Sequence, residues 1–95
     1  MDPAIPAGFA LVRRIGPFTA DTLPRGLLGE HRLKPDRWGH LTLEAGAVRL
    51  VWDDGSSRSE DLAAPAQALI PPEVPHHLEF TDDFVLRIDF LQQAG

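Results

Sequence analysis

The sequence predicts an all-β domain, a sandwich or barrel built from short strands. Nine prolines and eight glycines divide the chain at short intervals. The apolar runs between them are about five to ten residues long, a spacing typical of all-β sandwiches and barrels. Since no window keeps a 3.6-residue period over three turns, we expect no long amphipathic helix.

Each expected strand ends at a glycine, a proline or a polar turn. Two chain reversals stand out: a pivot at Ala45-Gly46, interpreted as a hairpin, and Asp54-Gly55, the strongest short hairpin signal in the chain. In the last strand Phe84, Leu86, Ile88 and Phe90 alternate inward, which leaves Arg87 and Asp89 outward. The expected strands cover residues 9–15, 27–33, 38–45, 47–52, 58–62, 67–70, 76–80 and 84–91.

Length and composition limit the function classes. Ninety-five residues predict one domain over 1–95, with an N-terminal arm at 1–8 and a tail at 92–95. A net charge of −5 with scattered arginines and a single lysine argues against a nucleic-acid partner. The absence of cysteine excludes disulfides and thiolate sites and suits a reducing cytoplasm, where we expect the protein. No stretch resembles a signal peptide or a membrane span, so no membrane role is expected.

The stretch from Leu69 to Leu78 contains the strongest candidate for a site. Its three prolines (71, 72 and 75) fix φ and stiffen a short turn between two expected strands. The turn presents Glu73 and His76 three residues apart. Alternation then places His76 inward, on the face of Leu78, and His77 outward.

A second inward histidine makes a metal site the leading hypothesis. In the expected strand 27–33, alternation places His31 on a face with two leucines. Two buried imidazoles must find partners. Together with Glu73 and His76, His31 has the composition of a two-histidine, one-carboxylate site for Zn²⁺, Fe(II) or Mn²⁺. Such a site leaves coordination positions open for water or a small-molecule ligand.

Each of these residues also has a structural interpretation. The two histidines can hydrogen-bond backbone carbonyls, and Glu73 can be a solvated turn residue. His77 and Trp38 are candidates for the cavity rim, although a surface histidine and a packing tryptophan are the simpler interpretations. We expect His40 to face solvent. The serines lie in or beside one polar turn without a nearby histidine, which argues against a Ser-His-Asp hydrolase.

The segment Ile70-Pro-Pro-Glu-Val-Pro-His-His77 resembles the second conserved motif of cupins, in which a proline-containing turn precedes a metal-binding histidine. His76 stands at that ligand position. The first cupin motif is degenerate here: His31 matches one of its two histidines, Gly46 matches its closing glycine, and its glutamate has no counterpart. The resemblance implies a cupin-like double-stranded β-helix, a jelly-roll sandwich or barrel.

The chain more closely resembles a small bacterial cupin family of uncertain function. This family includes the domain that precedes the methyltransferase in some tellurite-resistance proteins. The resemblance implies an association with tellurite or nitrogen-oxide stress. The matching features run over nearly the whole chain: Phe18-Thr, Pro24-x-Gly-Leu-Leu28, His31, Lys34, Trp38-Gly39, Leu-Glu-Ala-Gly46, Pro71-Pro-Glu-Val-Pro-His76 and the Phe-x-x-x-Phe of the final strand.

Three functions are compatible with these features. The first is a metal-binding small cupin that binds or senses a small molecule in a stress response. The second is a metal-dependent enzyme of oxygenase or isomerase type, against which the lack of a third histidine or a second acid–base group counts. The third is a structural or partner-binding β-domain with a vestigial site. Open strand edges also predict a homodimer.

Overall fold

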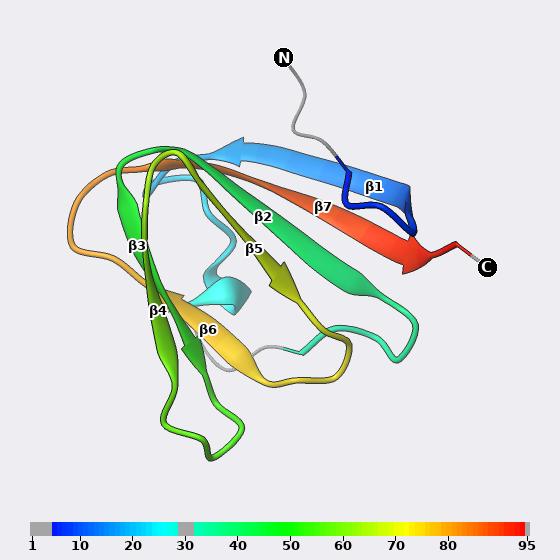
Figure 1. Ribbon diagram of the computed structural model, residues 1–95. Coiled ribbons are helices and arrows are strands. Elements are labelled where there is room, and N and C mark those ends of the chain that lie inside the picture. The colour runs from blue at the N-terminus through cyan, green and yellow to red at the C-terminus, as the bar shows by residue number, and fades with distance from the viewer. Residues whose placement is uncertain (1–4, 29–31, 95) are drawn as a thin grey trace.

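The computed structural model describes residues 5–28 and 32–94, which form an all-β fold as predicted (Figure 1). The one helical element in these ranges is a short 3₁₀ turn, η1 (Arg25–Leu27). None of the described helices is long and apolar enough to cross a membrane. The strands are β1 (Phe9–Phe18), β2 (Trp38–Ala45), β3 (Ala47–Trp52), β4 (Ser59–Ala63), β5 (Ala66–Ile70), β6 (His76–Glu79) and β7 (Val85–Gln93).

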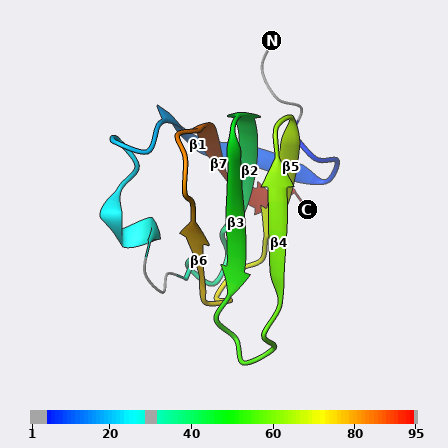
Figure 2. The same ribbon diagram turned by 90° about the vertical axis from the view of Figure 1, so that its left-hand side faces the viewer.

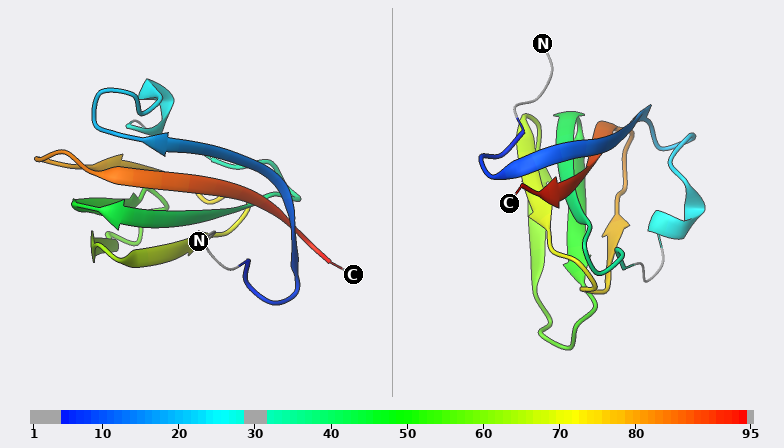
Figure 3. Two further views of the ribbon diagram at one scale, coloured as in Figure 1. Left: turned by 90° about the horizontal axis from the view of Figure 1, so that it is seen from above. Right: turned by 90° about the vertical axis from the view of Figure 1, so that its right-hand side faces the viewer.

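The strands form two antiparallel sheets that do not close into a barrel within the described ranges. The four-stranded sheet has the order β1-β7-β2-β5 and the three-stranded sheet the order β4-β3-β6. Figure 2 looks onto the three-stranded sheet, with β3 between β6 and β4, and the left view of Figure 3 shows β1 and β7 side by side. The arrangement is a sandwich, because each sheet needs the other to cover its apolar face.

The core lies between the sheets and follows the predicted alternation. Leu41 and Leu43 of β2 face Leu50 of β3, and all three are almost completely buried. Strand β7 adds Leu86 and strand β6 adds Leu78. Since strand side chains alternate, every second residue of these strands reaches the core.

The chain changes sheets at Gly46, so the hairpin predicted there is wrong. Strand β2 belongs to one sheet and β3 to the other. Gly46 adopts a φ of +79°, and a Cβ at this position would lie 2.5 Å from the Asp83 carbonyl oxygen. Only glycine fits so close a backbone approach. The chain crosses back to the four-stranded sheet between β4 and β5. This connection lies beside Gly46, since the Ala64 N–H donates to the Gly46 carbonyl at 3.0 Å.

The hairpin predicted at Asp54-Gly55 is confirmed. Strands β3 and β4 pair across this turn, with Val51 opposite Ser59 next to it. Gly55 has a φ of +84°, the left-handed conformation that such turns require. Strand β7 continues to Gln93, two residues into the predicted tail.

The strand predicted over residues 27–33 is wrong in its described part. Hydrogen bonds from Leu27 N–H to the Pro24 carbonyl and from Leu28 N–H to the Arg25 carbonyl close a tight turn instead. Arg32 and Leu33 lie in an irregular segment that leads to β2. Residues 29–31 lie outside the described ranges. Local i to i+3 hydrogen bonding therefore replaces sheet pairing in this segment.

His40 and Asp89 point to the predicted side of the sheet, but the prediction that His40 faces solvent is wrong. Both lie on the face of the four-stranded sheet that points away from the core, yet His40 is 3% and Asp89 is 1% exposed. They stand directly opposite each other on β2 and β7, and Asp89 stands opposite Arg14 of β1. Neighbouring side chains on adjacent strands cover them, because directly opposed residues lie within contact distance.

Candidate functional site

His76 begins β6 and points between the sheets, as alternation predicted. Its side chain is only 4% exposed, and its ring makes an edge contact with Trp52 at a centroid distance of 6.1 Å. The Nδ1 atom lies 2.8 Å from the Val74 carbonyl oxygen. Since a carbonyl can only accept, Nδ1 carries the hydrogen, and in the neutral form of the ring Nε2 carries the lone pair. Metal-ligating histidines are commonly oriented in this way.

His76 opens onto a small cavity between the sheets. The cavity has a volume of about 30 Å³, and His76 is the one polar side chain among the described residues around it. At roughly 10–15 Å³ per water molecule, this space holds about two waters. It is far smaller than the roughly 300 Å³ at which organic ligand pockets begin. The surrounding residues are Leu27, Leu33, Gly39, Leu41, Ile70, Leu78, Ile88 and Phe90.

The proline-rich turn before His76 is hydrogen-bonded to neighbouring segments at two points. The Glu73 N–H donates to the Leu33 carbonyl at 3.1 Å, and the Asp53 N–H donates to the Pro75 carbonyl at 2.8 Å. Glu73 itself adopts a φ of +63°, which is uncommon for a residue with a Cβ. Glu73 is exposed to solvent. The backbone of the turn is therefore held in place by two hydrogen bonds.

The predicted metal ligands are only partly placed by the structure. His31 lies outside the described ranges, so its position relative to His76 stays a prediction. Within residues 5–28 and 32–94, no three histidine, aspartate or glutamate side chains gather as a metal site. Trp38, predicted at the rim, packs edge-on against Phe9 at 5.2 Å and does not line the cavity. Of the proposed ligands that lie in the described ranges, His76 is therefore the one that lines the cavity.

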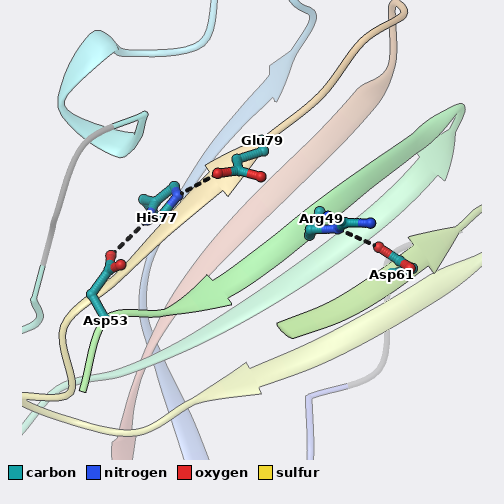
Figure 4. A network of polar contacts seen from close by, with 5 residues as sticks. All are labelled: Arg49, Asp53, Asp61, His77 and Glu79. Carbon is teal, nitrogen blue, oxygen red and sulfur yellow. Dashed lines mark hydrogen bonds and ion pairs between the residues drawn. The ribbon is translucent and has the colours of Figure 1, made fainter. Parts of the chain in front are cut away.

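His77 lies on the outer face of the three-stranded sheet, between two carboxylates (Figure 4). Its Nδ1 lies 2.6 Å from Asp53 Oδ2, and its Nε2 lies 2.9 Å from Glu79 Oε2. The hydrogen bond with Asp53, followed by that with Glu79, raises the pKa of His77 above its ordinary value of 6.5. Both ring nitrogens are engaged on the outer face, and His77 is not among the residues around the cavity.

A buried polar row on the outer face of the four-stranded sheet escaped the sequence analysis. Arg14 donates from Nε to Asp89 Oδ1 at 2.6 Å and from Nη2 to Oδ2 at 3.3 Å. His40 Nε2 lies 3.2 Å from Gln67 Oε1, while its Nδ1 is 3.9 Å from Asp89 Oδ2. The opposite charges of Arg14 and Asp89 were the available signal, but recognising them as a pair requires the register of β1 against β7.

Three solved structures have a similar fold. TehB from Haemophilus influenzae is 20% identical, with a TM-score of 0.82 over 92% of this chain and 32% of that one. A protein from Escherichia coli K12 is 23% identical, with a TM-score of 0.83 over 99% of this chain and 91% of that one. A protein from Neisseria meningitidis is 15% identical, with a TM-score of 0.55 over 96% and 79% of the two chains.

The chain therefore spans about a third of the length of the Haemophilus TehB, 32% of it, and most of the Escherichia coli protein. No curated protein matches the sequence. The model of the TehB-like domain matches residues 13–88, and the predicted resemblance to the tellurite-resistance-associated domain is confirmed. Since this match covers most of the described strands, the chain belongs to the family of TehB-like domains.

Proposed function

We propose that this TehB-like domain is a binding module that holds a small inorganic ligand, a metal ion with its water, beside His76. The observation that carries the proposal is that His76 is the one polar side chain among the described residues around a cavity of about 30 Å³. With its hydrogen on Nδ1, a neutral imidazole can offer the Nε2 lone pair to a metal ion. The cavity volume suits an ion and its water better than an organic substrate.

The donor chemistry at the turn supports a divalent metal. In this proposal His76 binds through Nε2, with His31 and Glu73 as the remaining protein ligands. The Val74 carbonyl that receives the Nδ1 hydrogen would hold the ring in its ligating orientation. Zn²⁺, Fe(II) or Mn²⁺ would supply a Lewis acid with open positions for water or a small anion. The two facing sheets and the proline turn are compatible with the cupin type of double-stranded β-helix.

The lining of the cavity favours binding over catalysis. Besides His76, the described residues around the cavity offer no acid or base that can donate or accept a proton. General acid–base chemistry needs such a group within hydrogen-bond reach of the reacting atoms. We therefore propose sensing or storage of the ligand in a stress response. The tellurite or nitrogen-oxide setting comes from the family resemblance and not from the geometry.

Two further proposals concern the setting of the protein. We place it in the cytoplasm, because a chain without cysteine suits a reducing compartment. We also propose a homodimer formed through an edge strand. Strands β1 and β5 lie at the edges of the four-stranded sheet and offer unpaired backbone groups.

Elemental analysis of tag-free protein tests the metal proposal. We expect a stoichiometric divalent metal in the wild type and its loss in both His31→Ala and His76→Ala. His77→Ala is the matched control, because it removes the neighbouring imidazole, which faces the other way. Added metal should also raise the unfolding temperature of the wild type and of His77→Ala, but not that of His31→Ala or His76→Ala.

Two outcomes would contradict the proposal. A wild type that stays metal-free after loading and is as stable as His76→Ala would favour a structural β-domain with a vestigial site. Metal-dependent turnover of an organic compound, lost in His76→Ala, would favour the enzyme instead.

A further inference from the structure

A second hollow lies next to the cavity, because Leu33 and Phe90 belong to the lining of both spaces. The second hollow is an open groove of about 410 Å³ between strands β1 and β7 and the segment before β2. We call it the basic groove, because its lining includes Arg13, Arg32, Lys34 and Arg37.

The charge of the basic groove contrasts with the rest of the chain. The protein has a net charge of −5 and only nine lysines and arginines, yet four of the nine line this groove. None of the described residues that line it is acidic. Of the five arginines outside the groove, four lie within 4 Å of a carboxylate. The pairs are Arg14–Asp89, Arg49–Asp61, Arg58–Asp54 and Arg87–Glu44.

Two of the groove cations lack such a partner. Among the residues that the structure describes, no carboxylate pairs with Arg13 or Lys34, and Arg37 has only Asp36 at 3.8 Å. Arg13 and Lys34 thus share one groove without a described carboxylate beside either, and like charges repel one another. An anion in the groove would relieve this repulsion.

A β-bulge in β1 directs Arg13 toward the groove. The pairing with β7 shifts between Leu11 and Arg13, so that Arg13 stands opposite Phe90 and Arg14 opposite Asp89. Because successive side chains alternate, Arg14 reaches the buried Asp89 while Arg13 shares the face of Phe90. Bulges commonly re-aim side chains next to binding sites. Val12, at the shift, adds an exposed apolar side chain to the groove lining.

We propose that the basic groove binds a small organic anion. Its phosphate or carboxylate group would bind the guanidinium and ammonium groups, whose geometry suits such oxyanions. Its apolar body would lie on Val12, Leu33 and Phe90. The groove volume falls in the range of organic ligand sites, about 300–1,000 Å³, and exceeds what an inorganic oxyanion alone fills.

This site is separate from the one proposed beside His76. The described lining of the basic groove includes neither Glu73 nor His76, two of the proposed metal ligands. Binding in the groove should therefore be the same in metal-loaded and chelated protein. Failure of either proposal leaves the other intact.

A backbone-amide NMR titration with two probes, phenyl phosphate and inorganic phosphate, tests the proposal. We expect phenyl phosphate to give saturable shifts at Val12, Arg13, Leu33 and Phe90. Arg13→Gln and Lys34→Gln should each weaken its binding by about tenfold, as expected for the loss of one charge-assisted contact. Added salt should weaken it further. Arg58→Gln, an exposed arginine outside the groove, should leave the affinity unchanged.

The apolar half of the groove has its own test. Val12 is 45% exposed, so Val12→Ser should fold normally. It should weaken phenyl phosphate binding and leave inorganic phosphate binding unchanged. Equal affinity for the two probes would overturn the organic part of the proposal. Shifts that do not saturate, or binding that Arg13→Gln leaves intact, would overturn the site itself, as would preference for anionic lipid vesicles over the soluble probe.

Discussion

The outward faces of the two sheets carry the same ion pair in different surroundings. On the three-stranded sheet, Arg49 and Asp61 meet at 2.7 Å with side chains 53% and 75% exposed (Figure 4). On the four-stranded sheet, Arg14 and Asp89 meet at 2.6 Å, and the aspartate is 1% exposed. The two pairs have nearly equal N···O distances, but we expect them to contribute differently to the stability of the fold. Exposed pairs contribute little, whereas removing one partner of a buried pair is costly.

Strand position accounts for the difference. Asp61 lies on β4, at the edge of its sheet, whereas Asp89 lies on β7, between β1 and β2. Asp89 therefore has Arg14 on one side and His40 on the other. With neighbours on both flanks, the short Asp89 side chain has lost contact with water although it points away from the core.

The largest effect is expected when the aspartate of each pair is replaced by alanine in two separate variants and the two are compared. Asp89→Ala should lower the free energy of unfolding by about 3 kcal/mol, the lower end for a broken buried pair, because Arg14 retains some contact with water. Asp61→Ala should leave the urea midpoint unchanged. Urea denaturation followed by circular dichroism measures both. Equal losses in the two variants would show that burial does not separate the two pairs.

A smaller effect is expected at His40, next to Asp89. Its ring makes one hydrogen bond, to Gln67, and its Nδ1 has no hydrogen-bond partner among the described residues. His40→Leu should therefore change the free energy of unfolding by about 1 kcal/mol or less, because the lost bond and the removed unsatisfied atom offset each other. Urea denaturation at neutral pH checks this. A loss as large as that of Asp89→Ala would indicate that His40 and Asp89 act as one ion pair.

The smallest effect is a pH dependence on the exposed face, at His77. Its pKa is raised by Asp53 and Glu79, so protonation favours the folded state. This contribution is complete below the ordinary value of 6.5 and is lost as the pH rises from there through the raised pKa. The difference in unfolding free energy between wild type and His77→Gln should therefore shrink as the pH rises above 6.5. A constant difference between about pH 5.5 and pH 8.5 would contradict the shift.

Much of the fold was predictable because its signals are local. Proline and glycine spacing predicted seven of the strands to within a few residues, and the last strand was predicted almost in full. The inward direction of His76 followed from alternation alone. The segment before β2 was not predictable, since its alternating residues are equally compatible with a strand and with the tight turn at Arg25–Leu27.

The sequence by itself determined the class of fold, the turn before His76 and the opposite directions of His76 and His77. These follow from a two-residue period and from prolines, which act within a few residues of themselves. Tertiary structure alone decided which sheet each strand joins, that Asp89 and His40 are buried, and that four cations share one groove. Alternation determines the side to which a residue points, but what covers that side comes from strands that are distant in the chain.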